Sequence, residues 1–339
     1  MKVRRNYRLA SALALMFGLS ACGGGGGAGL SSTPAPIAGP TPTPTPTPVP
    51  PPPPGGPNGL VRDQPFAVLG ISNTIAKRAD GSFASTSIAP AAVSIRYIGA
   101  DDAYEMSILD FEAGRLKTLG YGGSFNGTGW LRVSSSYNAL TKGNSAIEQD
   151  VRVTLQRPRG PLNPDVIFTY TSYGSWQDGG VLQTSSATTG HEGLFAYGIP
   201  TALGDVPTTG SASYVASVVG KTESNQFSGS SFHSAEVLGS AYLNFDFAGG
   251  LLTGHMQPEL CPFDCIDLGR YDFTETIYST GSRSFSGKFA TPGSTANSFF
   301  EGSFNGPQAA EVMARWSAPY RDPAGNWGTM FGIWVGKKR

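Results

Sequence analysis

Charge is scarce in this sequence, and long apolar runs are missing from most of it. Only 24 of its 339 residues are Lys or Arg and 24 are Asp or Glu, so the formal net charge is zero. A chain without a basic excess lacks the electrostatic footprint of a nucleic-acid-binding protein. No apolar run after residue 22 approaches the roughly 20 residues that a transmembrane helix needs. We therefore expect neither nucleic-acid binding nor a membrane-spanning helix in the mature chain.

Catalytic signatures are also missing. The three histidines, His191, His233 and His255, have no spacing that would place two imidazoles on one face of an element. The sequence contains no G-x-S-x-G nucleophile elbow and no P-loop, and its glycine-rich residues 120–130 lack a dinucleotide fingerprint. We expect each histidine to lie on the surface or in a turn. The sequence predicts no enzyme, no catalytic residue, no metal ligand and no cofactor.

Cysteine is rare, and the first of three cysteines, Cys22, ends an apolar run near the N-terminus. Residues 9–19 are apolar and follow a segment with four basic residues and no acidic one. Such a run is too short to span a bilayer and is typical of a signal peptide. The four residues Leu-Ser-Ala-Cys fit the lipobox of bacterial lipoproteins, which predicts cleavage after residue 21 and acylation of Cys22. The alternative is an ordinary secretory signal with a chance cysteine.

The residue after the lipobox indicates the destination. Gly23 stands where retention in the inner membrane usually calls for Asp, which favours the bacterial outer membrane. Removal of residues 1–21 takes away four of the 24 basic residues and no acidic one, so the mature net charge would be −4.

The other two cysteines, Cys261 and Cys265, stand four residues apart in "CPFDC". An exported protein meets an oxidising compartment, where such a pair usually forms a disulfide. One turn of chain can bring the two Cβ atoms close enough for the bond. The alternative is a metal or redox site, for which only His255 is close in sequence.

Residues 22–63 are dominated by glycine and proline. Five glycines follow Cys22, and 13 of the 26 prolines lie between Pro34 and Pro57. Proline at this density favours extended polyproline II and cannot pack a core, so we expect a disordered linker. At roughly 3.1 Å per residue, residues 31–58 could reach on the order of 85 Å. This segment is interpreted as a swivel and a spacer that lift a folded domain off the bilayer.

The remaining chain has the pattern of two antiparallel β domains, residues 64–204 and 205–339. In the first, apolar residues alternate in "AVSIRY", "AYEMSI" and "VRVTL", and residues 166–176 are β-branched and aromatic. Strict alternation predicts strands with one buried face. In the second domain we expect eight strands, at residues 211–220, 237–248, 251–257, 271–279, 284–290, 298–305, 309–317 and 327–336.

These eight strands predict a closed barrel with a filled interior. Glycines stand between aromatic residues in "FSGKF" and "FEGSF", where they allow strand curvature and make room for bulky neighbours. The side chains expected to point inward are Leu243, Phe245, Phe247, Phe285, Phe289, Phe300, Phe304, Val312, Ala314 and Trp316. The last strand is apolar on both faces, so its register cannot be read from the pattern.

Several segments carry a resemblance to a known family. The motifs "TTGSASYVASVVG", "LGSAYLNFDFAGGLLTG", "FFEGSFNGPQAAEVMARW" and "GTMFGIWVGKK" resemble the barrel signature of the transferrin-binding protein B family. "TYTSYGSW" resembles the segment of the family's handle domain that precedes the barrel. The resemblance runs from about residue 65 to the end and implies an all-β, single-lobe surface lipoprotein with a handle-like domain and a barrel. The matching positions build the barrel, and no ligand-binding residue carries over.

Three function classes follow: a surface lipoprotein that binds a protein or a metal- or haem-loaded carrier, a carrier of a small apolar ligand inside the barrel, and an enzyme. An eight-stranded barrel is barely wide enough for its own side chains, which favours the first class with an unidentified partner. Binding would then fall to loops at residues 120–130, 177–192 and 257–267. Constrained aromatic residues are typical anchors, so the candidates are Tyr121, Phe125 and Phe263. The alternative is that these rings cap sheet edges.

Overall fold

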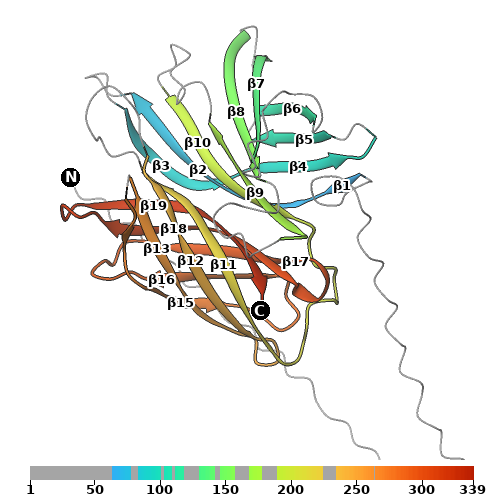
Figure 1. Cartoon of the computed structure of the whole chain (residues 1–339), viewed down its shortest axis with the longest axis vertical. Coiled ribbons are helices and arrows are strands. Elements are labelled where there is room, and N and C mark those ends of the chain that lie inside the picture. Colours follow the sequence, from blue (N-terminus) through green and yellow to red (C-terminus); the bar gives the residue numbers. More distant parts are fainter. Residues whose placement is uncertain are drawn as a thin grey trace, which may run out of the picture. The chain divides into compact units, whose positions relative to one another are not determined.

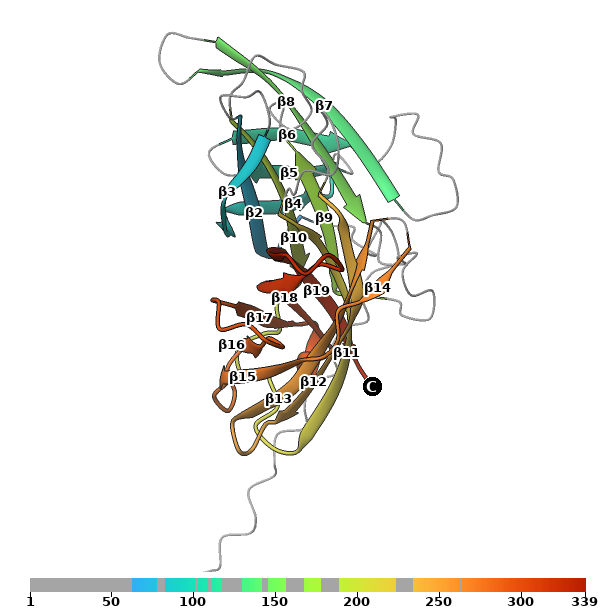
Figure 2. The ribbon, with the colours of Figure 1, turned by 90° about the vertical axis from the view of Figure 1, so that its left-hand side faces the viewer.

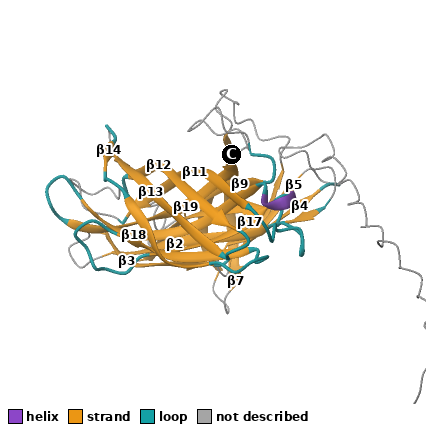
Figure 3. Cartoon of the chain, turned by 90° about the horizontal axis from the view of Figure 1, so that it is seen from below, coloured by secondary structure: helices purple, strands orange, loops and turns teal. Residues whose placement is uncertain are grey.

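The structure is a computed structural model, and it describes residues 63–77, 83–100, 103–108, 111–117, 130–141, 146–156, 168–177, 189–223, 234–262 and 264–339. Nearly all of the described elements are strands (Figure 3), and the one helical turn among them is the 3-10 helix Pro307–Ala309. No described helix has the length and apolar character needed to cross a membrane. The predicted signal peptide, Cys22 and the proline-rich linker lie outside the described residues.

The C-terminal half forms a closed antiparallel barrel of eight strands, as predicted. Around the barrel the order is β12-β11-β19-β18-β17-β16-β15-β13, and β13 pairs back with β12 (Figure 1). The two-residue β14 (Ile266–Asp267) pairs only with the end of β13. The strands are β11 (Ser211–Thr222), β12 (Glu236–Asp246), β13 (Leu251–Cys261), β15 (Tyr271–Ile277), β16 (Ser284–Ala290), β17 (Phe299–Asn305), β18 (Glu311–Arg321) and β19 (Trp327–Lys338).

The inward-facing side chains are those that the alternation predicts. All ten predicted inward residues are at most 6 % exposed and belong to one apolar cluster. The structure also decides the register of β19, because Met330 and Trp334 join this interior cluster. Their neighbours Phe331, Ile333 and Val335 point outward and join a different cluster.

The N-terminal half contains two antiparallel sheets (Figure 2). One has the order β1-β4-β5-β6, and the other has the order β3-β2-β10-β9-β8-β7. The strands are β1 (Gln64–Pro65), β2 (Ala67–Lys77), β3 (Phe83–Ala91), β4 (Val93–Ile98), β5 (Ala103–Ile108), β6 (Phe111–Lys117), β7 (Trp130–Thr141), β8 (Ala146–Gln156), β9 (Thr171–Gln177) and β10 (Thr189–Gly198).

Strand β10 is buried on both faces because each face packs against a different layer. Phe195 and Tyr197 cluster with Ile95 and Tyr104 of the four-stranded sheet. Leu194 and Ala196 cluster with the outward-facing residues of β18 and β19. The six-stranded sheet therefore lies between the four-stranded sheet and the barrel wall, which explains why β19 is apolar on both faces.

Three strand boundaries differ from the sequence-based prediction by four residues or more. The strand expected from residue 166 begins at Thr171, since residues 168–170 form no ladder. Strand β13 continues to Cys261 instead of ending at residue 257, because β12 and β14 pair with its last residues. Strand β18 continues to Arg321, because β19 pairs with it along its full length. In each case the pairing partner decided the end.

Candidate functional site

A disulfide joins Cys261 and Cys265, as predicted, with an S–S distance of 2.07 Å and a Cα–Cα distance of 4.1 Å. Cys261 ends β13, directly opposite Glu236 at the start of β12. After Cys265 the chain returns as β14, where Ile266 and Asp267 pair with Leu260 and Glu259. The bond therefore closes the tip of a hairpin at one end of the barrel. The loop expected at residues 257–267 is shorter than predicted and consists of residues 262–265.

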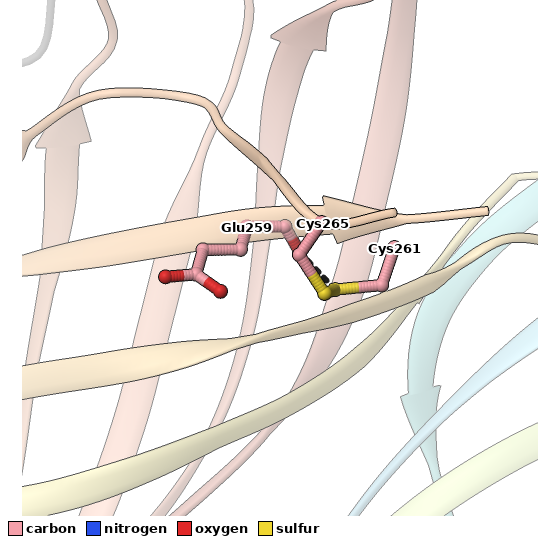
Figure 4. Close-up of a disulfide and its surroundings, with 3 residues drawn as sticks. All are labelled: Glu259, Cys261 and Cys265. Atoms are coloured by element: carbon pink, nitrogen blue, oxygen red, sulfur yellow. Dashed lines mark hydrogen bonds between the residues drawn. A yellow bond between two sulfur atoms is a disulfide. The ribbon is translucent and has the colours of Figure 1, made fainter. Parts of the chain in front are cut away.

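The alternative of a metal site at these cysteines fits the structure poorly. Glu259, Cys261 and Cys265 bring potential ligand atoms within 4.8 Å of one another (Figure 4). Both sulfur atoms are already used in the disulfide, so Glu259 is the one conventional ligand of the three. His255 lies six residues before Cys261 on the same strand, about 20 Å away at roughly 3.3 Å per residue. The histidine therefore cannot complete a site at the tip.

The surface around the disulfide is acidic. Glu236, Glu259, Asp264 and Asp267 are all exposed. Glu259 and Asp267 are direct cross-strand partners, so their side chains leave the sheet on the same face. None of the four belongs to an ion pair among the described residues, while nearby Arg270 pairs with Asp272 at 2.7 Å. We expect the field at this end of the barrel to be negative.

The barrel interior is packed with aromatic rings. The centroids of Phe245 and Phe304 are 4.8 Å apart, and those of Phe289 and Phe300 are 5.3 Å apart. Trp334 lies 5.2 Å from Phe300, and its Nε1 lies 3.4 Å from the sulfur of Met256. Ring contacts at these distances fill the space between facing strands. The predicted filling of the interior is confirmed for these side chains.

Two tyrosines place hydroxyl groups in this interior, and each donates to a backbone carbonyl. Tyr214 donates to Ala309 at 2.6 Å, and Tyr271 donates to Pro319 at 3.2 Å. Burial raises the pKa of Tyr271 to about 12. The pKa of Tyr214 is also raised, first by burial and then by Tyr278. Both hydroxyls stay neutral at ordinary pH and serve the packing of the barrel.

Glu192 of β10 is a buried carboxylate between the six-stranded sheet and the barrel. It is 0 % exposed and accepts a hydrogen bond from Lys221 of β11 at 2.6 Å. Asn73 of β2 donates to the same carboxylate at 3.4 Å, and Ser234 donates at 3.3 Å. A buried charge that is paired in this way has a structural role.

Glu311 of β18 forms a second buried link between the two halves. Its carboxylate accepts the backbone amides of Thr169 and Tyr170, at 2.7 and 2.9 Å, just before β9 begins. Burial raises the pKa of Glu311, and these hydrogen bonds and Lys337 oppose the rise. The sequence analysis missed both glutamates. The sequence did contain a sign of their burial. Each glutamate lies on the same face of its strand as buried apolar residues, as Glu192 does with Leu194 and Ala196.

The predicted partner-binding residues stay predictions. Tyr121, Phe125 and Phe263 lie outside the described residues, as does Cys22. The loop predicted at residues 177–192 is shorter than expected, because Thr189 to Glu192 belong to β10. The described residues therefore include the strands and the disulfide on either side of the tip, but not Phe263.

The two described histidines lie in strands and are partly exposed, so of the two expected places, surface or turn, the turn is wrong for both. His191 is half-buried in β10, with its ring centroid 6.4 Å from that of Trp176. His255 is half-buried in β13 and stacks on Tyr242 at 4.9 Å. Burial, and then Arg270, lower the pKa of His255, while Asp272 across the ladder opposes this shift. His233 lies outside the described residues.

Among known proteins, the chain is similar only in structure to the matches described below, which are solved structures. No protein-family model matches the sequence, and no curated protein matches it. A double mutant of transferrin-binding protein B from Haemophilus parasuis is 13 % identical, with a TM-score of 0.43, and the match covers 81 % of this chain and 45 % of that one. Transferrin-binding protein B from Neisseria meningitidis serogroup B is 15 % identical over 80 % of this chain and 43 % of its own, with a TM-score of 0.41.

A third solved structure matches over nearly its whole length. It is described as a surface lipoprotein and is 12 % identical, with a TM-score of 0.38 over 80 % of this chain and 99 % of that one. The chain spans less than half the length of the two transferrin-binding proteins.

Proposed function

We propose that this protein is an outer-membrane lipoprotein, displayed at the cell surface, that binds a protein or a metal- or haem-loaded carrier in nutrient acquisition. The observation that carries this proposal is the aromatic packing inside the barrel. An interior taken up by Phe245, Phe289, Phe300 and Trp334 favours binding at outer surfaces over binding inside the barrel. This packing also disfavours the alternative, a solute carrier with its ligand inside the barrel.

The N-terminal sequence supports display on a membrane. The lipobox ending at Cys22 predicts a lipid anchor, and the proline-rich linker supplies a long spacer before the first strand. We propose the domain division given by the sequence: signal peptide 1–21, anchor and linker 22–63, handle-like domain 64–204 and barrel 205–339. This arrangement suits a protein whose folded domains are tethered to a bilayer through a long spacer.

The disulfide tip supports a binding role for one end of the barrel. Residues 264–267 are exposed, and the bond between Cys261 and Cys265 constrains the loop that carries Phe263. An aromatic ring on a constrained loop loses little conformational entropy when it binds. Tyr121 and Phe125 are proposed as a second set of contacts.

Affinity capture tests the proposal. The Cys22→Ser chain, immobilised as bait, should retain a host or environmental protein, or haem. With the captured ligand, Phe263→Ala should weaken binding at least tenfold, equivalent to about 1.4 kcal/mol, and leave the melting temperature nearly unchanged. Trp327→Ala is a matched control, because Trp327 is an exposed aromatic residue (46 %) at the same end of the barrel. Binding that survives Phe263→Ala intact, or loss of the fold with Phe263→Ala, would rule out the tip as the binding surface.

A further inference from the structure

Three aliphatic side chains are exposed at the end of the barrel opposite the disulfide. Leu203 is 82 % exposed, Leu251 is 54 % exposed and Ile277 is 68 % exposed. Leu251 begins β13 and Ile277 ends β15, and Leu203 lies between β10 and β11. We call these three residues the aliphatic rim. Large apolar side chains are costly to leave in water, and a group of them marks a contact surface.

The rim residues are held in place by the barrel. The ladder between β13 and β15 pairs Met256 with Tyr271, and Thr276 donates to the carbonyl of Leu252 at 2.9 Å. Leu251 and Ile277 therefore lie on neighbouring strands at the same end. Leu203 lies at the same end, beside the turn between β17 and β18, since Val206 is buried in the barrel core and Asp205 accepts the amide of Gln308 at 2.8 Å.

Three basic side chains lie at the same end of the barrel as the aliphatic rim. Arg283, Lys338 and Arg339 are exposed at this end, and none of them is in an ion pair among the described residues. Lys338 lies over the ring of Phe247, and Arg339 lies over the ring of Tyr242. The nearby carboxylates, Asp205 and Asp246, accept backbone amides. The two ends of the barrel thus differ, because the disulfide end carries four exposed carboxylates that form no ion pair among the described residues, and one of them, Asp267, accepts a backbone amide from Gly269.

We propose that the aliphatic rim seats the barrel on the anionic lipid surface to which the chain is tethered, and so turns the disulfide tip away from that surface. Aliphatic side chains with cationic neighbours are the combination that inserts at a lipid headgroup boundary. The inference rests on the proposed lipid anchor. A tether makes the contact effectively intramolecular, so a weak surface contact is enough to set the orientation. The spacer sets how far the barrel can stand from the membrane, and contact of the aliphatic rim with lipid would hold the barrel at the near limit of that range.

The geometry makes the two ends easy to distinguish. Strand β18 has 11 residues, about 36 Å at roughly 3.3 Å per residue. With a strand tilt of about 40°, the ends of the barrel lie on the order of 27 Å apart. If the aliphatic rim touches lipid, Trp327 at the other end is far from it.

The test tethers the full Cys22→Ser chain by an N-terminal histidine tag to vesicles that contain nickel-chelating lipid, phosphatidylcholine and phosphatidylglycerol. An environment-sensitive bimane label is attached to Ile277→Cys, with Trp327→Cys as the control. A quencher carried on lipid chains should quench the Ile277 label several-fold more than the Trp327 label. Leu203→Ser with Leu251→Ser should reduce quenching at residue 277 toward the control, and omission of phosphatidylglycerol should also reduce it.

Equal quenching at the two positions, or stronger quenching at residue 327, would overturn the proposal. The proposal would also be overturned if, in the absence of vesicles, a second copy of the chain shielded the Ile277 label from solvent as strongly as the vesicles do. Because the histidine tag replaces the acyl group, the result does not depend on lipidation. Failure of the proposed lipid anchor would be detected separately, by intact-mass analysis of the wild-type protein that shows no mass for the lipid.

Discussion

Glycine and aromatic residues are matched atom by atom across the barrel wall. At Gly302 of β17, an added Cβ would lie 2.2 Å from Cζ of Phe285 on the neighbouring strand. At Gly287 of β16, it would lie 2.5 Å from Cζ of Phe300. Each glycine therefore leaves the space that an inward ring of the adjacent strand occupies. This reciprocal arrangement explains the alternation in "FSGKF" and "FEGSF".

Gly302→Ala should lower the free energy of unfolding by about 1–3 kcal/mol, because the new methyl group overpacks the interior. Denaturant unfolding followed by tryptophan fluorescence would measure the change. Ser211→Ala, at an exposed position on β11, should change the stability by less than about 0.5 kcal/mol. Wild-type stability in Gly302→Ala would show that the barrel is packed more loosely than its ring distances indicate.

The raised pKa of Tyr271 predicts that the folded protein loses stability at alkaline pH. Burial raises its pKa from 10.0 to about 12, so the folded protein keeps a proton that the unfolded chain loses. The resulting stabilisation is fully present below pH 10 and falls as the pH rises toward 12. Tyr271→Phe should be about 1 kcal/mol less stable at neutral pH, because it lacks the hydrogen bond to Pro319. The gap should narrow between pH 10 and 12 in unfolding experiments, and a gap that stays constant would contradict the assignment.

At the scale of elements, β10 and β19 are the strands that join the two halves. Each presents one face to a core of its own half and the other face to a shared apolar cluster. The charged groups Glu192, Lys221 and Glu311 lie along the margins of this shared cluster. Buried polar links of this kind can fix which surfaces meet, while apolar contact supplies most of the free energy.

The Glu192–Lys221 pair should therefore show strong coupling. Removal of one partner of a buried pair costs about 3–5 kcal/mol of stability. Lys221 keeps 18 % of its side chain exposed and is therefore partly solvated. We expect the loss of stability in Glu192→Gln to fall in the lower part of that range. Adding Lys221→Met should restore part of the loss, which corresponds to a coupling energy of about 0.5–3 kcal/mol. Denaturant unfolding of the two single variants and the double variant would measure it.

The control is the exposed pair of Glu275 and Lys288, whose side chains are 67 % and 52 % exposed. The same double-mutant cycle there should give at most about 1 kcal/mol. Equal coupling in the two pairs would show that burial adds nothing to the interdomain link.

At the scale of the whole molecule, the predicted lipid anchor decides where the protein acts. Cys22→Ser should remove acylation and leave the protein released from the membrane fraction or mislocalised, because the lipid on Cys22 is the proposed attachment to the bilayer. Cell fractionation with intact-mass analysis would measure both effects. Unchanged membrane association of a chain without lipid would contradict the anchor. Protease treatment of intact cells would test surface display.

Alternation along the chain determined most of the barrel before any tertiary information. The inward-facing residues from Leu243 to Trp316 could be predicted from period-two spacing. On a strand with one buried and one solvated face, apolar and polar residues alternate, so the buried positions can be recognised in the sequence. The disulfide followed from two cysteines in a chain predicted to be exported. These features are local, so the sequence alone could predict them.

Only the tertiary structure decided the features that depend on a partner layer. Phe331 and Trp334 are equally apolar, and which of them points inward became clear only from the six-stranded sheet that covers β19. The same contact explains why Glu192 and Glu311 are buried, and pairing with β12 and β14 carried β13 to Cys261. A sequence pattern shows that a face is buried but not what covers it. The covering surface comes from residues distant in the chain, and their packing fixes the register, the strand ends and the buried charges.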